Sequence, residues 1–275
     1  MGYGFKAGLN FSNFQGPSEL GPDGSELETN ELITGFHIGA IINFKFAELA
    51  GLRTELMFSQ KGSRYNYDGP SFQHFQIVNQ NNVLETTGTK KISLNITNAY
   101  IDIPVMGYFR ATDWLEVSGG ASIGFLVSSI AAGDLSYSGA TAGGALVEDI
   151  LIGLDYNYTT DDELVLNPDD ATTATIGGQT ITIPRTVGSY FDQSLYGGSF
   201  DGNLFNTIDL GLVGGINIFL NQGLSLGLRA NYGLSDITRN ESDHYRQELG
   251  PDRQLITSTD KDVNFSIQTS IGFSF

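Results

Sequence analysis

The sequence predicts an all-β fold, an eight-stranded antiparallel up-and-down transmembrane β-barrel. Three observations predict it. Eight stretches alternate apolar and polar residues, as expected when successive strand side chains point to opposite faces. The connections between these stretches are alternately long and short. The apolar face of the stretches carries no charge in any of the eight.

The eight strands are expected in order at 3–13, 35–44, 52–59, 100–109, 115–125, 208–218, 224–233 and 263–275. Each has an apolar face with residues at every second position. Two members from each strand, in order, are Phe5 and Leu9, Phe36 and Ile38, Leu52 and Leu56, Ile101 and Ile103, Val117 and Ile123, Ile208 and Leu210, Leu226 and Leu228, and Phe265 and Ile271. This period of two favours strands over helices throughout.

The connections predict where the barrel sits. Short connections at 46–48, 111–114 and 221–223 belong at one end of an up-and-down sheet, and long ones at 14–32, 62–97, 127–205 and 235–262 belong at the other. Short periplasmic turns and long extracellular loops are typical of outer-membrane barrels. We therefore expect one domain over 1–275 in a bacterial outer membrane, with periplasmic N- and C-termini, extracellular long loops and membrane lipid around the strands.

The second face of the strands is polar. Its charged members are Lys6, Arg53, Glu55, Asp102, Glu116, Asp209 and Arg229. A Lys or Arg facing hydrocarbon near the midplane costs about 2–4 kcal/mol, so this face belongs inside. The lumen of an eight-stranded barrel is just wide enough for side chains to fill it. We expect the charges to pair there as a polar plug, the alternative being a gated pore or proton path.

Composition limits the function. The net charge of −17 argues against a nucleic-acid partner, because phosphate binding needs clustered Lys and Arg. Of the 31 acidic residues, 25 fall in the four long connections, so the acidity belongs to the expected loops. The chain has no cysteine, which excludes disulfides and thiol chemistry.

Three segments carry a family resemblance. The segments 4–12 (GFKAGLNFS), 55–62 (ELMFSQKG) and 100–105 (YIDIPV) resemble the PorT-like small outer-membrane β-barrels of Bacteroidota. The last strand, which ends in Phe275, resembles the signal read by the barrel-insertion machinery. The resemblance spans the strands, about half of the chain. It implies a barrel without an assigned reaction and a link to cell-envelope secretion, since the founding member is linked to the type IX secretion system.

The longest connection carries a hairpin signal. Two alternating stretches at 173–176 and 179–183 flank Gly177-Gly178, which is typical of a two-residue primed turn. We expect this third long loop to bear a β-hairpin extension or to form a lid. Its aromatics either contact a partner or pack within the loop: Tyr156, Tyr158, Tyr190, Phe191, Tyr196 and Phe200.

Metal and cofactor signals are weak. Asp155, Asn157, Asp161, Asp162 and Glu163 supply the oxygen ligands that Ca²⁺ prefers. The glycine and glutamate spacing of an EF-hand is missing, which favours a solvated acidic face. We expect no other cofactor.

The leading hypothesis is a non-enzymatic barrel whose extracellular loops bind a partner, as a subunit of a larger cell-envelope complex for secretion or uptake. A narrow channel for ions or small solutes is the first alternative. The second is a surface enzyme acting on lipid or peptide, in which His244 with Asp243 and Asp236 could form an Asp–His set.

Overall fold

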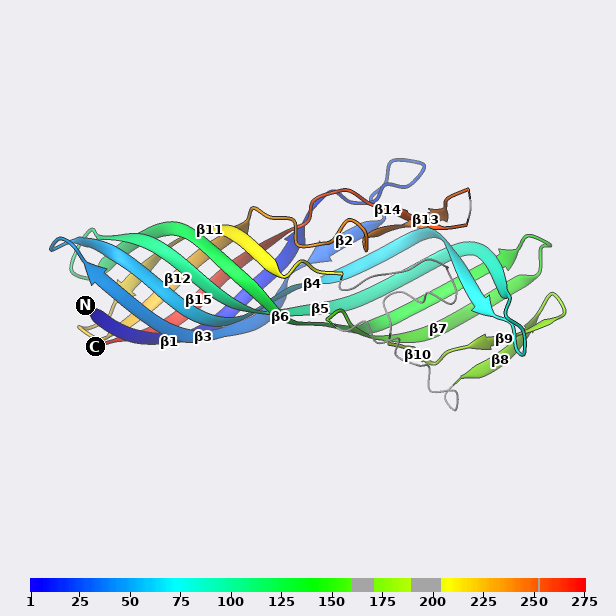
Figure 1. Ribbon diagram of the computed structural model, residues 1–275, viewed down its shortest axis with the longest axis horizontal. Helices are drawn as coiled ribbons and strands as arrows, with labels where there is room; N and C mark the ends of the chain where they lie inside the picture. Colours follow the sequence, from blue (N-terminus) through cyan, green and yellow to red (C-terminus); the bar gives the residue numbers. More distant parts are fainter. Residues whose placement is uncertain (160–170, 189–203, 252) are drawn as a thin grey trace.

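The computed structural model describes residues 1–159, 171–188, 204–251 and 253–275, and every regular element in these ranges is a β-strand (Figure 1). Eight strands form a closed antiparallel ring, which confirms the predicted fold class. In order around the ring they are β1 (Gly2–Gln15), β3 (Ile33–Lys45), β4 (Ala50–Gln76), β5 (Val83–Arg110), β6 (Leu115–Thr141), β11 (Ile208–Phe219), β12 (Leu224–Gly233) and β15 (Val263–Ser274).

The two termini lie at the same end as the three tight turns (Figure 1). Gly4 pairs with Ser274 where β1 meets β15, and the short connections 46–49, 111–114 and 220–223 join β3 to β4, β5 to β6 and β11 to β12. Within the described ranges, no helix is long and apolar enough to cross a membrane.

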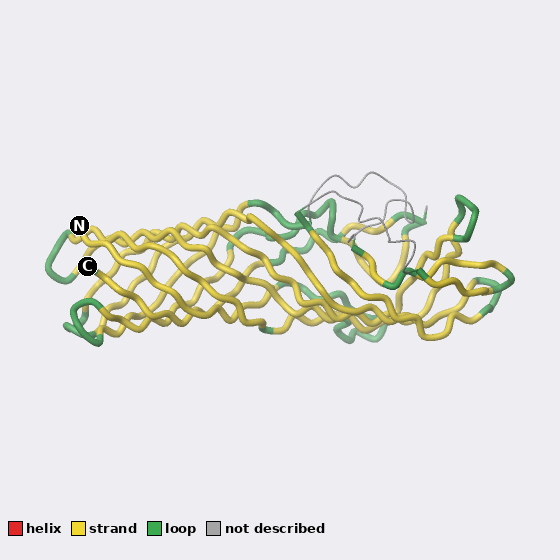
Figure 2. Tube along the Cα trace, turned by 90° about the horizontal axis from the view of Figure 1, so that it is seen from below, coloured by secondary structure: helices red, strands yellow, loops and turns green. Residues whose placement is uncertain are grey.

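Two of the expected long loops were predicted wrongly, because the structure has strands there. β4 continues to Gln76 and β5 begins at Val83, so the connection 62–97 is almost entirely strand. In the same way β6 continues to Thr141 and pairs with β7 (Leu146–Asn157), which both lie inside the expected loop 127–205. Figure 2 shows these strands running from the barrel into the opposite half of the molecule.

The strand ends predicted from the sequence came too early. The reason is that the apolar residues of these strands move from the outer face to the inner face at the barrel rim, the end of the barrel opposite the tight turns. Below the rim, β5 points Val105 outward and buries Asp102. Above it, the same strand buries Leu94 and exposes Ser93 and Asn95. Such a reversal is expected where a strand passes from lipid into water, because lipid requires an apolar outer face and water a polar one.

A β-bulge marks the rim on β6. Ala99 pairs with Ser128 and Tyr100 with Leu126, so Val127 is an extra residue without an opposite partner. A bulge bends its strand and re-aims the side chains beyond it. From this point β6 leaves the barrel and joins the upper structure, which we call the distal extension. It consists of the parts of β4, β5 and β6 beyond the rim together with β2 (Glu28–Glu31), β7, β8 (Thr172–Ile176), β9 (Gln179–Ile183), β10 (Thr186–Val187), β13 (His244–Leu249) and β14 (Leu255–Thr257).

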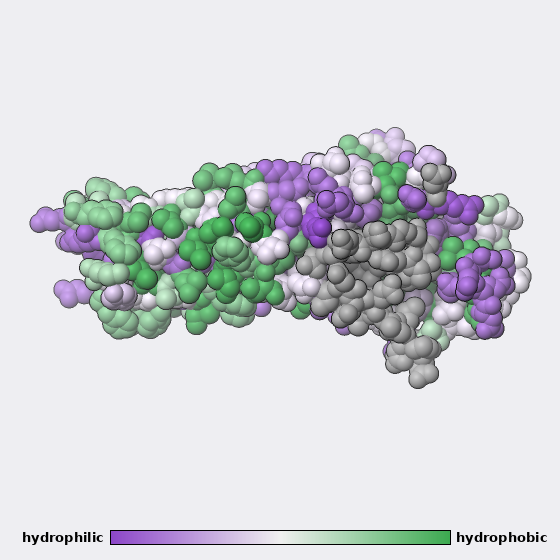
Figure 3. All heavy atoms as spheres, viewed as in Figure 1, coloured by the Kyte–Doolittle hydropathy of each residue, from purple (hydrophilic) through white to green (hydrophobic). Residues whose placement is uncertain are grey.

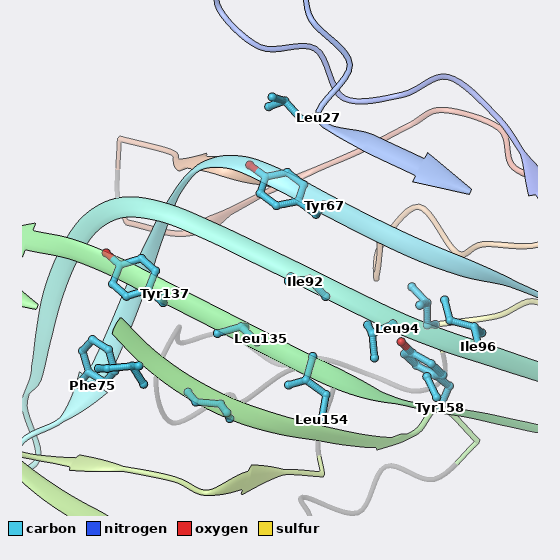
Figure 4. Close-up of a cluster of buried hydrophobic side chains, with 14 of the residues drawn as sticks. Leu27, Tyr67, Phe75, Ile92, Leu94, Ile96, Leu135, Tyr137, Leu154 and Tyr158 are labelled. Carbon is cyan, nitrogen blue, oxygen red and sulfur yellow. The ribbon is translucent and has the colours of Figure 1, made fainter. Parts of the chain in front are cut away.

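The distal extension has its own apolar core (Figure 4). Its buried members come from the inner faces of β4, β5, β6 and β7 and from the segments packed on them. They include Leu27, Tyr67, Phe75, Ile92, Leu94, Ile96, Leu135, Tyr137, Leu154 and Tyr158. Tyr156 packs against the same core, so these two tyrosines pack inside the loop, while Tyr190, Phe191, Tyr196 and Phe200 lie outside the described residues.

The predicted hairpin is confirmed. β8 (Thr172–Ile176) pairs with β9 (Gln179–Ile183) across Gly177 and Gly178, whose φ angles of 57° and 82° are the positive values that a primed turn requires. Ile181 is fully buried and bridges to Ile77, which attaches the hairpin to the end of β4.

The first and last long connections also contain strands. β2 (Glu28–Glu31) pairs with β4, and β13 (His244–Leu249) pairs with β14 (Leu255–Thr257). β10 (Thr186–Val187) pairs in parallel with β7 at Gly153 and Leu154. Figure 3 shows apolar residues concentrated over the barrel half of one face and more polar residues over the distal extension.

Candidate functional site

One ion-pair layer of the lumen joins three strands. Lys6 Nζ on β1 and Arg229 Nη2 on β12 each lie 2.7 Å from Glu55 Oε2 on β4. The inward parity of the three residues places them there, and their side chains are nearly or fully buried. Charge-assisted bonds of this length are strong, and both cations compensate one buried carboxylate.

A second layer surrounds Glu116 on β6. Arg53 Nη1 lies 2.7 Å from Glu116 Oε1, and Arg110 Nε lies 3.7 Å from Glu116 Oε2. The guanidinium of Arg53 also stacks 5.2 Å from the ring centre of Tyr108. Glu116 is completely buried, so it depends on these partners to offset its lost hydration.

The third layer, at the rim, depends on a residue that the strand assignment missed. Lys61 Nζ lies 3.0 Å from Asp102 Oδ1, 3.3 Å from Asp209 Oδ2 and 4.7 Å from the ring centre of Tyr100. The expected strand ended at Ser59, but Lys61 has the same inward parity. Continuing the strand by one alternation would have found it.

The structure places all seven expected lumen residues on the inner face and brings each into one of these ion pairs. With Lys61 and the partly exposed Arg110, five basic residues meet four acidic ones. The cavity that remains among Lys6, Arg53, Glu55 and Arg229 measures about 20 Å³. That is room for about one water molecule, so the side chains fill this part of the lumen.

A second cavity lies where the barrel meets the distal extension, and we call it the mouth cavity. It measures about 80 Å³. One part of its wall is apolar and contains Phe14, Tyr65, Leu94, Ile96, Tyr158, Leu204 and Phe205. The other part is acidic, with Glu19, Glu28, Asp243, Asp260 and Asp262 around Arg246.

Hydrogen bonds across the mouth cavity tie the first and last long connections together. The Glu19 carboxylate accepts bonds from the backbone N–H of Arg246 at 3.0 Å and of Gln247 at 3.1 Å. The Glu19 N–H donates to Glu28 Oε1 at 3.0 Å. Arg246 Nε donates to the Tyr65 hydroxyl at 2.8 Å, which attaches β13 to β4. These bonds join three segments that are far apart in the sequence. We call the bonded residues, together with the carboxylates that line the cavity, the clasp.

The carboxylates in the clasp are crowded. Burial, together with the charge of Asp260, raises the pKa of Asp243 to about 6. Burial, together with the charges of Asp243 and Asp260, raises the pKa of Asp262 to about 7. Burial also raises the pKa of Glu28. Near neutral pH the clasp therefore holds protons that free carboxylates would have lost.

The residues considered for catalysis are only partly brought together. Asp243 and His244 line the mouth cavity, and burial lowers the pKa of His244. Asp236 Oδ1 instead accepts bonds from Thr238 N at 3.1 Å, Thr238 Oγ1 at 3.0 Å and Asp262 N at 3.2 Å. Asp236 is therefore engaged in holding its own loop.

The calcium candidates do not form a cluster in the described part of the chain. Asp155 is exposed on β7, and Asn157 Oδ1 accepts bonds from Thr159 N at 3.0 Å and Thr159 Oγ1 at 2.7 Å. Asp161, Asp162 and Glu163 lie outside the described residues. Among the described residues, no three acidic or histidine side chains are grouped so as to hold a metal ion.

A match to a protein-family model agrees with the fold. The model of the outer membrane protein beta-barrel domain family matches residues 1–239. Among solved structures, Ail, the attachment invasion locus protein of Yersinia pestis, is 9% identical over 100% of this chain and 98% of its own, with a TM-score of 0.37. OprG from Pseudomonas aeruginosa is 10% identical over 100% and 95% with a TM-score of 0.34, and Neisserial surface protein A is 11% identical over 99% and 95% with a TM-score of 0.31. No curated protein matches the sequence.

Proposed function

Because the chain belongs to the outer membrane protein beta-barrel domain family, it is a bacterial outer-membrane barrel, and we propose that it is a non-enzymatic subunit of a larger cell-envelope complex. In this proposal the distal extension binds the partner, and the complex serves secretion or uptake.

One observation carries the proposal: buried ion pairs occupy the lumen and fill part of it, whereas the distal extension is an ordered structure with its own core. Buried ion pairs occupy the lumen in three layers. Beyond the rim, β4, β5 and β6 continue and enclose an apolar core together with β7. A barrel whose only role is to be filled by side chains does not need a folded extension. A rigid extension held away from the membrane gives a partner protein a preorganised surface to bind.

We propose that the termini and tight turns face the periplasm and that the distal extension is extracellular. The acidic residues of the extension and the position of both termini at the tight-turn end support this orientation. The PorT-like segments lie on β1, β4 and β5, and their resemblance to barrels of Bacteroidota supports a role in secretion.

The proposal is tested by purification from native membranes. An affinity tag is inserted between Asp23 and Gly24, an exposed turn of the first long connection, and the protein is extracted with mild detergent. We expect a species heavier than the monomer that contains a second envelope protein in stoichiometric amount. A strictly monomeric species with no such protein would contradict the proposal. The same tag in the 111–114 turn is the control, and antibody access to each tag on intact cells tests the orientation.

The non-enzymatic and non-conducting parts of the proposal have separate tests. Turnover of a lipid or peptide substrate that His244→Ala abolishes would show that the protein is an enzyme. In planar bilayers we expect no steady single-channel current. A current that Arg53→Gln alters would show instead that the lumen conducts.

A further inference from the structure

The mouth cavity has two walls of different chemistry, and the proposed docking of a partner protein uses neither. Its volume is about 80 Å³. An apolar protein cavity of about 150 Å³ holds one benzene molecule. On that scale the mouth cavity has room for a ligand of about three non-hydrogen atoms.

One wall of the mouth cavity is built from packed aromatic rings. The ring centres of Phe14 and Phe205 lie 5.7 Å apart, and Tyr158 meets Phe205 edge to face at 5.3 Å. The three residues are at most 6% exposed, and Tyr158 lies beside Ile96 in the core of the distal extension (Figure 4). Aromatic rings attract cations that lie within about 6 Å of their faces. This wall therefore suits a positively charged ligand with a short apolar part.

The other wall carries more negative charge than the cavity compensates. Arg246 is the one lysine or arginine among the residues that line it. Among the described residues, no carboxylate of this wall forms an ion pair with a basic side chain. A buried carboxylate without a cation tends to keep its proton, and the raised pKa values of Asp243 and Asp262 fit that state. The carboxylates of this wall are Glu19, Glu28, Asp243, Asp260 and Asp262.

A buried acceptor without a donor lies at the same cavity. Asn30 is one of the lining residues, and its Oδ1 is buried and receives no hydrogen bond within the described ranges. Buried acceptors are rarely left unpaired, so a donor is expected there. A metal ion does not fit, because no three acidic or histidine side chains of the described residues are grouped to hold one. An ammonium group fits better, since it brings three N–H donors together with a positive charge.

We propose that the mouth cavity binds a small primary alkylammonium ion. Its ammonium group donates to Asn30 Oδ1 and to the carboxylates of Asp243 and Asp262, and its methylene groups pack on Phe205 and Tyr158. Binding replaces the protons that the carboxylates otherwise hold. This inference goes beyond the proposed function, because the cavity lies inside the protein where the barrel meets the distal extension and its occupation does not require a docked partner.

The direct test uses the full-length protein in lipid nanodiscs and ethylammonium chloride at pH 8, followed by saturation-transfer NMR of the ligand. Signals from empty nanodiscs are subtracted. We expect a Kd of about 1 mM, close to the limit for a ligand of about three non-hydrogen atoms. Ethanol, which has the same size and no charge, should give no saturable signal. Equal binding of ethanol would overturn the inference, because it would show an apolar cavity without a preference for cations.

Variants identify the cavity as the binding site. Asp243→Asn/Asp262→Asn should weaken binding about tenfold or more, and Phe205→Leu should weaken it about threefold. The matched control is Glu26→Gln/Glu248→Gln, which makes the same change in net charge at two exposed residues outside the cavity. It should leave the Kd almost unchanged. Equal affinity of the wild type and Asp243→Asn/Asp262→Asn would overturn the inference, and so would an equal loss in the control.

A measurement on the wild type keeps the test decisive if a variant does not fold. Ethylammonium stays charged between pH 5 and pH 8, whereas Asp243 and Asp262 gain protons as the pH falls through this range. The other titratable groups that line the cavity can also only gain protons: Glu19, Glu28, Tyr65, Tyr158, His244, Tyr245, Arg246 and Asp260. The affinity should therefore be about tenfold or more lower at pH 5 than at pH 8. An affinity that does not change with pH, or complete displacement by an equal concentration of sodium ions, would overturn the inference.

Discussion

Replacing Lys61 with methionine removes the only cation that contacts Asp102 and Asp209 in the described residues. The Lys61 side chain is 6% exposed, and the two carboxylates are 11% and 7% exposed. Methionine keeps the length and packing of the side chain but leaves two buried negative charges close together. Removing one partner of a buried pair costs about 3–5 kcal/mol, and we expect a loss of that size in the free energy of unfolding.

Lys91→Met is the matched control. Lys91 Nζ lies 2.7 Å from Asp68 Oδ2, which is shorter than either Lys61 contact, but the two side chains are 64% and 62% exposed. Exposed pairs contribute about 0–1 kcal/mol. The same substitution therefore separates the effect of burial from the effect of distance.

The measurement is reversible urea unfolding in lipid vesicles, followed by the fluorescence of Trp114, the single tryptophan. A third variant, Lys61→Met with Asp102→Asn and Asp209→Asn, removes all three charges and should recover most of the lost stability. The reasoning is refuted if Lys61→Met costs no more than Lys91→Met, or if the triple variant is no more stable than Lys61→Met.

Three further predictions concern the distal extension. Leu94→Ala, at a 2% exposed core position, should lower the free energy of unfolding by about 2–5 kcal/mol. The extension should become sensitive to protease while the barrel keeps its folded mobility on gels. Loss of the folded barrel together with the extension would contradict a separate core in the extension. The raised pKa values of Asp243 and Asp262 mean that the folded state binds more protons than the unfolded state, so the clasp should weaken as pH rises from about 4 to about 7. The thermal midpoint should accordingly be lower at pH 8 than at pH 5, with a smaller difference in Asp262→Asn; an unchanged difference in that variant would count against the assignment. Gly177→Val forces a β-branched residue to φ 57° and should destabilise the β8–β9 hairpin by about 1–2 kcal/mol, seen as faster amide exchange at Ile181, whereas Thr175→Val should not.

Local rules of the sequence predicted much of the barrel. Alternation assigned each residue to a face, and the absence of charge on one face placed lipid outside. Gly177-Gly178 predicted the hairpin because a primed turn needs a positive φ at two consecutive residues, and glycine, which has no side chain, adopts such angles at low cost. The bulge on β7 had no comparable signal. Glu148 and Asp149 are consecutive in the sequence, so strict alternation predicts opposite faces, whereas the bulge on β7 leaves both exposed.

The sequence by itself determined the face of each residue, since the side-chain period of a strand is a property of the local backbone. It did not determine how far along each strand the apolar face stays on the outside, because that depends on what surrounds the strand. Leu94 and Val105 lie on opposite faces of β5, and each is apolar for a different reason: one packs in a protein core and the other faces lipid. Only the tertiary structure decided where that change occurs, and with it that Glu19 meets Arg246 across more than 200 residues of chain.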